Sequence, residues 1–352
     1  MKKLLLVSLL ALGAATVNAQ DKPADPPLTI TGSVDAYYKY DFSGQKTNIP
    51  TSFASDHNSI SIGMVDLALK KKVGKASFVG ELSFGPRGQA QSILPTPTGP
   101  GGAESYHIQN LYVSYDATDK LNLTLGYMGT FVGYEVISPV GNFNYSTSYL
   151  FTNGPFQNAG FKATYSFSSK ASLMVGVFND QWNVYTSVDK ANTLGAQLFV
   201  SPVEGWTAYI NFIYGKNRTI TSGTVVDLTT AYQITDAFKL GLNAASYSAS
   251  EGAGTGGYQG VALYPQLAVS SAVTLGLRGE YFKTKTGTLA TFGPAPGESV
   301  TAITATANIK SGPLTFIPEF RIDNGSANSF VNSSGAATKS AQQFLLAAVY
   351  AF

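Results

Sequence analysis

The chain has no cysteine and only two histidines among its 352 residues. Without cysteine, an exported protein has no disulfide to hold its fold together and must close through its own backbone and side-chain contacts. The two histidines, His57 and His107, have no metal-ligand spacing, and the lack of thiolates argues against a zinc site. The sequence therefore predicts neither a metal nor another cofactor.

Charged side chains are also scarce. They make up 12% of the chain, which is about half of the share that is usual in soluble globular proteins. Lys2 and Lys3 are the only charges before Gln20, so the remaining chain has 21 basic and 21 acidic residues. This balance argues against nucleic acid or an anionic surface as the main partner.

Long hydrophobic runs are absent after the N-terminal segment. Residues 1–19 combine two lysines, a short apolar run and the sequence Val17-Asn18-Ala19, which fits a cleavage site with small residues. We expect a signal peptide that is removed there, followed by a short Pro-rich lead over 20–27. No later run reaches the ~20 apolar residues that a membrane helix needs, so entry into a membrane requires strands.

What the chain has in abundance is alternation of apolar and polar residues. In the last strand, one parity is occupied by Phe344, Leu346, Ala348, Tyr350 and Phe352. The same period of two runs through 121–127, 161–167, 206–214 and 314–322. An apolar face toward lipid and a polar face toward the interior are typical of transmembrane β-barrels. Tyr350 and Phe352 are then candidates for the signal that the barrel-assembly machinery reads.

Short and long polar breaks alternate along the chain. Seven short breaks lie near 71–75, 117–120, 168–170, 202–205, 235–237, 270–272 and 310–313, and eight long ones near 42–58, 85–105, 130–156, 179–192, 216–223, 248–259, 283–299 and 324–340. Bacterial barrels alternate short periplasmic turns with longer external loops in the same way. We therefore predict, over 28–352, an all-β transmembrane antiparallel up-and-down β-barrel of about sixteen strands, with fourteen as the alternative.

Three positions fit this pattern poorly. The apolar parity changes near Gly63, which predicts a β-bulge there or a wrong strand boundary. Pro265 and Pro318 lie within predicted strands, where proline has no N–H to donate to a ladder.

A series of short motifs lies between two of the predicted strands. They are Gly133-Tyr134-Glu135, Asn142-Phe143-Asn144-Tyr145-Ser146, Pro155-Phe156, Ala159-Gly160-Phe161 and Val177-Phe178-Asn179 before Trp182. In this order, the segment from 121 to about 183 resembles the beta-barrel porin-2 family of OmpL-like outer-membrane proteins. The family typically has Arg after the Tyr-Ser pair, whereas Thr147 stands here, so no charge-based role carries over. The resemblance implies a β-barrel porin of unassigned substrate and no reaction.

The longest break, 130–156, is the third external one, and Glu135 is its only charge among seven aromatic residues. In sixteen-stranded general porins the third loop folds into the lumen and narrows it, and we expect the same here, with Glu135 near the constriction. Arg278 lies on about the thirteenth strand, opposite the root of this loop, which suggests a transverse field between the two charges. The alternative is an external cap that packs on its own aromatic rings.

Charged residues on the interior parity complete the candidate site. They are Asp35, Lys39, Glu81, Lys162, Lys239, Arg278, Glu280, Glu319 and Arg321, together with Asp227. On the lipid face each would cost ~2–4 kcal/mol at the membrane midplane, whereas on a wet lumen wall it would tune ion selectivity. The alternative is that these charges pair with lumen neighbours and set no selectivity. The interior tyrosines Tyr37, Tyr112, Tyr209 and Tyr264 fit either sugar stacking or an aromatic girdle.

Together these features predict a porin of the Gram-negative outer membrane that lets small hydrophilic solutes or ions diffuse passively, with weak ion selectivity. Its expected partners are outer-membrane lipids, the barrel-assembly machinery and the solutes, and a homo-oligomer stays open. The first alternative is a non-conducting barrel that acts as a surface adhesin or binding protein. An enzyme lacks support, since the Asp56 and Ser59 beside His57 fit the polar composition of a loop, and His107 has no flanking Ser-Asn motif of the barrel phospholipase kind. A non-membrane all-β exported protein would need more surface charge.

Overall fold

A computed structural model describes residues 25–87, 106–179, 190–216, 222–251, 254–289 and 291–352. The predicted signal peptide over 1–19 lies outside these residues, as does most of the predicted lead over 20–27. Within the described ranges, no helix is both long and apolar enough to cross a membrane.

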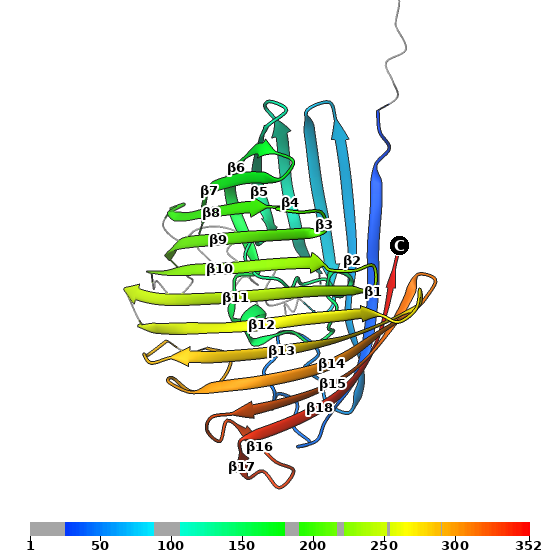
Figure 1. Ribbon diagram of the computed structural model, residues 1–352, viewed down its shortest axis with the longest axis vertical. Coiled ribbons are helices and arrows are strands. Elements are labelled where there is room, and N and C mark those ends of the chain that lie inside the picture. Colours follow the sequence, from blue (N-terminus) through cyan, green and yellow to red (C-terminus); the bar gives the residue numbers. More distant parts are fainter. Residues whose placement is uncertain (1–24, 88–105, 180–189, 217–221, 252–253, 290) are drawn as a thin grey trace, which may run out of the picture.

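The protein is a closed antiparallel barrel of sixteen strands (Figure 1). The strands are β1 (Thr29–Asp41), β2 (Ser59–Val73), β3 (Ala76–Phe84), β4 (Tyr106–Asp116), β5 (Leu121–Gly129), β6 (Gln157–Ser168), β7 (Ala171–Phe178), β8 (Thr193–Val200), β9 (Trp206–Lys216), β10 (Ser222–Gln233), β11 (Phe238–Glu251), β12 (Gly256–Ala268), β13 (Val273–Lys285), β14 (Ser299–Ser311), β15 (Leu314–Gly325) and β18 (Ser340–Ala351). A small hairpin of β16 (Phe330–Val331) and β17 (Ala337–Thr338) lies in the last long loop. The third loop, residues 130–156, contains a 3₁₀ turn, η1 (Pro139–Gly141), and a short helix, α1 (Tyr149–Asn153).

Consecutive strands pair with each other, and the first strand closes the barrel on the last. Gly32 and Phe352 exchange both backbone hydrogen bonds at this seam, each with 3.0 Å between nitrogen and oxygen. The alternation of short turns and long connections agrees with the predicted one throughout, so the strand number is sixteen and not fourteen.

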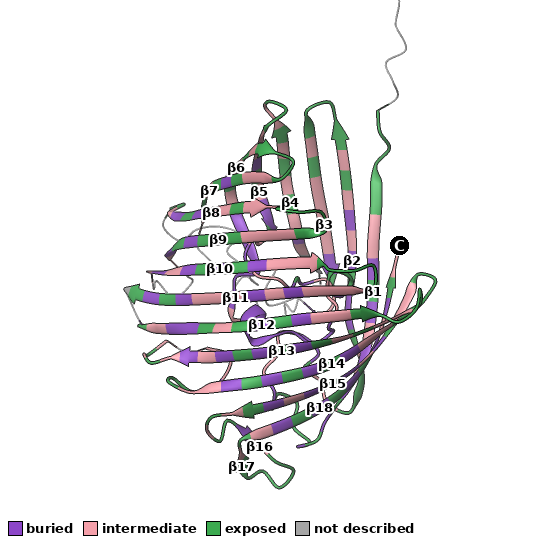
Figure 2. Cartoon of the chain, viewed as in Figure 1, coloured by how far each residue is buried: buried purple, intermediate pink, exposed green. Residues whose placement is uncertain are grey.

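Side chains alternate between the inside and the outside of the barrel. In β18, Phe344, Leu346 and Tyr350 are exposed on the outer surface, whereas Leu345 and Val349 are buried inside. Buried and exposed bands follow one another along the strands (Figure 2). Because ladder hydrogen bonds satisfy the backbone of a closed barrel, its apolar outer surface is suited to lipid.

The irregular positions have local explanations. The register of β1 against β2 shifts between Val34 and Ala36, where Gly63 and Met64 together face the single residue Asp35. This is the predicted bulge, and the Asp35 carboxylate accepts a hydrogen bond of 2.9 Å from the Met64 backbone N–H. A Cβ on Gly63 would lie 1.8 Å from an Asp35 carboxylate oxygen, so a larger residue here would displace that carboxylate from the Met64 N–H.

Both prolines interrupt the ladder without breaking the barrel. Paired residues stop at Leu263 and resume at Gln266 where Pro265 faces β13. The pairing of β14 with β15 has a similar gap next to Pro318. Each proline lacks an N–H donor, and the effect is limited to one local gap in the pairing of its own strand, β12 or β15.

Substitution of Gly63 tests the bulge. Gly63→Val places a branched side chain on the Asp35 carboxylate, so we expect the folded fraction to fall markedly in refolding experiments. The measurement is the mobility difference of unheated and boiled samples in SDS gels. The matched control is Gly80→Val, because a Cβ at Gly80 meets no atom within 4 Å. Equal folding of the two variants would contradict the account of the bulge.

Candidate functional site

The third loop lies inside the barrel. It follows the end of β5, and α1 packs on the inner faces of β12 and β13, where Figure 1 places it behind these strands. Tyr145, Tyr149 and Leu150 are among its buried residues. The inward position agrees with the prediction, and the alternative of an external cap is wrong.

The loop is joined to the wall by a buried ion pair. Arg278, which is fully buried on β13, donates to the Glu135 carboxylate over 2.8 Å and to the Ser146 carbonyl over 2.6 Å. The hypothesis of a transverse field across an open gap is therefore wrong, because the two charges are in direct contact. Removal of one partner from a buried, hydrogen-bonded ion pair lowers the free energy of unfolding by about 3–5 kcal/mol, because the other charge is left buried and unpaired.

Two carboxylates of the wall bind the backbone of the loop. Glu280 accepts from the backbone N–H groups of Tyr149 (2.9 Å) and Leu150 (2.8 Å), at the start of α1. Glu319 accepts from the backbone N–H groups of Tyr145 (3.0 Å) and Ser146 (3.2 Å) and also from the Ser146 hydroxyl. An ionised carboxylate can only accept hydrogen bonds. It is therefore a good partner for the loop at these points, where the backbone presents N–H donors that would otherwise be unpaired.

A second buried ion pair lies two strands further along the wall, on β15. Arg321 binds Asp323 through two nitrogen–oxygen contacts of 2.7 and 2.9 Å and donates to the Thr147 carbonyl over 2.8 Å. Asp323 in turn accepts from the hydroxyl of Tyr149 over 2.7 Å. Burial raises the pKa of Tyr149 well above its ordinary value, so this hydroxyl stays a donor.

Tyr145 ties the loop to the first strand. Its hydroxyl donates to the Asp35 carboxylate, and burial raises the pKa of Tyr145 well above its ordinary value. The guanidinium of Arg87 lies between the rings of Tyr145 and Phe53, 4.6 and 4.5 Å from their centroids. The first loop, residues 42–58, is thereby packed against the third one.

Glycines of the wall make room for aromatic rings of the loop. A Cβ on Gly241 would lie 2.3 Å from the hydroxyl oxygen of Tyr134, and one on Gly276 would lie 2.2 Å from the ring of Phe143. Tyr134 also stacks on Tyr264 with 4.4 Å between ring centroids. The loop and the wall are therefore complementary in shape as well as in charge.

The predicted wall charges fall into two groups. Asp35, Lys39, Glu135, Asp227, Arg278, Glu280, Glu319 and Arg321 are all buried, mostly at 2% exposure or less. Asp227 accepts from the Gly133 backbone N–H of the third loop over 3.1 Å. Lys39 donates to the carbonyls of Lys46 and Ser55 and so holds the first loop. Glu81, Lys162 and Lys239 remain partly exposed on the inner wall. Only this second group faces space inside the barrel.

Sequence reasoning missed two residues of the anchoring network. Asp323 continues the parity of Glu319 and Arg321, but the predicted strand ended one residue earlier, so a longer strand would have included it. Arg87 follows β3 in a polar break, where apolar and polar residues do not alternate and the sequence does not indicate which side chains point inward.

Two cavities lie along the inner wall. One, of about 460 Å³, is lined by Asn110, Tyr112, Ser114, Asn122, Thr124, Met128, Gly129, Thr130, Lys162 and Thr164. The other, of about 310 Å³, is lined by Thr130, Phe131, Gly133, Tyr134, Gln197, Thr207, Tyr209, Thr229, Thr230 and Ala231. Thr130, the first residue of the third loop, borders both.

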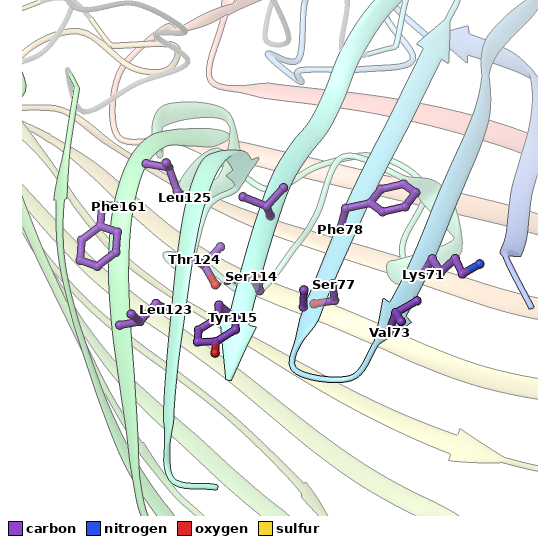
Figure 3. Close-up of a pocket in the computed structure, with 12 residues that line it drawn as sticks. Lys71, Val73, Ser77, Phe78, Ser114, Tyr115, Leu123, Thr124, Leu125 and Phe161 are labelled. Carbon is purple, nitrogen blue, oxygen red and sulfur yellow. Dashed lines mark hydrogen bonds between the residues drawn. The ribbon is translucent and has the colours of Figure 1, made fainter. Parts of the chain in front are cut away.

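A further hollow of about 510 Å³ lies on the outer surface and does not belong to the lumen (Figure 3). Its apolar lining comes from outward side chains such as Phe78, Leu125 and Phe161. A similar hollow of about 610 Å³ lies beside Pro265 and Pro318. Both lie on the face that suits lipid.

Neither the metal nor the enzyme hypothesis gains support. Among the described residues, no group of three His, Asp or Glu side chains is placed to hold a metal ion. The Nδ1 atom of His57 accepts a hydrogen bond of 2.9 Å from the Asp41 backbone N–H. The side chain of His107 lies outside the described part of the structure.

Solved structures of other outer-membrane proteins have the same fold. The chain is 13% identical to an anion-selective porin from Comamonas acidovorans, with a TM-score of 0.65 and coverage of 93% of this chain and 99% of that one. It is 15% identical to the outer membrane channel DcaP of Acinetobacter baumannii, with a TM-score of 0.62 and coverage of 94% and 99%. It is 14% identical to OmpF of Salmonella typhi, solved in a complex with daunomycin, with a TM-score of 0.61 and coverage of 92% of this chain and 97% of that one.

No curated protein sequence matches the chain. A family model does, over residues 27–352, which is nearly the whole chain and far more than the segment that carried the resemblance. Its description is "Putative beta-barrel porin-2, OmpL-like". The chain therefore belongs to this family of β-barrel porins.

Proposed function

We propose that this porin lets small hydrophilic solutes or ions diffuse passively through a water-filled lumen, which the third loop narrows. The observation that carries the proposal is the position of the loop inside the barrel, with most of its anchors on one side. Arg278, Glu280, Glu319 and Arg321 hold it against β13 and β15, and single contacts reach Asp35 on β1, Gln197 on β8 and Asp227 on β10. Polar side chains on β4, β6 and β9, such as Tyr112, Lys162 and Tyr209, stay partly exposed.

Export and location follow from the same proposal. Residues 1–19 would direct the chain out of the cytoplasm and be removed, and the barrel would lie in the outer membrane of a Gram-negative cell among its lipids. Tyr350 and Phe352, both exposed on the outer face near the seam, would be read by the barrel-assembly machinery. OmpT of Vibrio cholerae, a structural neighbour, has been solved in a trimer form, so a homo-oligomer is a reasonable arrangement for this chain.

The predicted wall charges would then have two roles. Those at the third loop, including Glu135, Arg278, Glu280, Glu319 and Arg321, would position the constriction. Glu81, Lys162 and Lys239 would tune ion passage because they face the lumen. Since this exposed group mixes both signs, we expect weak ion selectivity.

Planar-bilayer recordings of the refolded protein test the proposal. We expect stepwise openings of constant size and a reversal potential near zero under a salt gradient. A strong preference for cations or anions would contradict the role of the exposed charges. A correctly folded barrel that never conducts would favour the alternative of a surface adhesin or binding protein.

Removal of an anchor tests the narrowing. In Glu319→Ala, the buried N–H groups of Tyr145 and Ser146 lose their acceptor, at a cost of about 1–3 kcal/mol for each unsatisfied group. We expect the loop to leave the wall, with a larger and noisier single-channel conductance. Glu204→Ala is the matched control, because Glu204 lies in a short turn and is exposed. Unchanged conductance of a folded Glu319→Ala barrel would mean that this carboxylate does not hold the constriction.

A further inference from the structure

The two inner cavities differ sharply in chemistry from the anchored wall. Of all the residues that line them, only Lys162 carries a charge, and the others are mainly amides, hydroxyls and aromatic rings. By contrast, the charges of β13 and β15 are bonded to the third loop and buried. The two cavities are therefore lined mainly by neutral polar groups.

Both cavities lie on the inner face of the barrel. On β4, Tyr112 and Ser114 line the larger cavity, whereas their neighbours Leu111, Val113 and Tyr115 are exposed on the outer surface. On β9, Thr207 and Tyr209 line the smaller cavity, and Ile210 points outward. Volumes of about 310 and 460 Å³ are in the range of small-molecule sites.

Several polar groups in the cavities have capacity for a ligand. Among the described residues, the hydroxyls of Tyr112, Tyr209 and Thr164 have no protein partner, and neither does the ammonium group of Lys162. Neighbouring groups are already fixed: Ser114 and Thr124 are 2.9 Å apart, and Gln197 donates to Asn211 over 2.8 Å. Free hydroxyls on an ordered polar wall can both donate and accept hydrogen bonds.

Each cavity also presents an aromatic ring beside these groups. Tyr112 belongs to the larger cavity, and the Tyr209 ring of the smaller one packs on Phe199 with 5.1 Å between centroids. A tyrosine combines an apolar ring with a polar tip, so it can cover a C–H face and bind a hydroxyl at once. An uncharged polyhydroxylated molecule presents both of these partners, C–H faces and hydroxyl groups.

We infer that the two cavities are successive binding sites for neutral polyhydroxylated solutes, in the chemical class of small sugars, on either side of Thr130. The inference rests on the proposed function and gives its solute class. Lys162 is the one charged residue in the lining, where it supplies a hydrogen-bond donor, and the nearby Glu81 is already bonded to Asn110.

The test is the titration of single-channel current with sucrose, at constant salt and corrected for viscosity. We expect saturable blockade by sucrose in the wild-type channel. In Tyr112→Ala and Tyr209→Ala, the apparent affinity should fall about two- to tenfold, which is the loss expected for one aromatic contact. Tyr115→Ala and Tyr214→Ala are matched controls on the same strands, since both rings are exposed on the outer face.

Lys162→Gln separates sugar binding from ion passage. It should shift the reversal potential toward cations and leave the affinity for sucrose within about twofold, because glutamine still donates a hydrogen bond. A conducting channel without saturable blockade by sucrose would overturn the inference and leave the proposed function intact. Blockade that all four tyrosine variants weaken equally would also overturn it. A folded barrel with no conductance would overturn the proposed function, and the inference with it.

Discussion

The third loop stays inside the barrel because charged side chains of the wall bind its backbone. Arg278 and Arg321 each combine a carboxylate partner with a loop carbonyl, and Glu280 and Glu319 each accept two backbone N–H groups. A charge in this interior is tolerable only when it is paired and hydrogen-bonded. The wall therefore needs the loop as much as the loop needs the wall, and the constriction is part of the fold.

This mutual dependence decides which side chains a solute meets. Two ion pairs, Arg278 with Glu135 and Arg321 with Asp323, lie at the contact between the loop and β13 to β15, and Glu280 and Glu319 are bonded to the loop backbone there. Amides, hydroxyls and tyrosines on β4 to β10 remain for the passage. Most of the charged contacts of the loop thus lie on one side of the barrel, and glycines at positions 241 and 276 make room there for Tyr134 and Phe143.

The strands were predictable because a closed barrel imposes a period of two on every one of them, and each turn or loop interrupts that period. The sequence also predicted the bulge at Gly63 and the inward third loop. It did not predict that Glu135 and Arg278 are in contact, because they are 143 positions apart. The alternation within a strand shows which face of the barrel a side chain lies on, but it does not show which residue that side chain contacts. The role of Arg87 was not predicted for a related reason. Its guanidinium lies between Phe53 and Tyr145, which belong to two loops that meet only in the folded barrel.

The central claim is that the third loop rests on the wall of β13 to β15 while the channel conducts. The absence of native cysteine allows a direct test with Asn144→Cys and Thr306→Cys, whose native side chains are 2.7 Å apart. A short bifunctional thiol reagent would join the two positions during a bilayer recording. We predict that the link forms and leaves the single-channel conductance unchanged. Loss of current on linking, or failure of the two thiols to react with one reagent, would contradict the account.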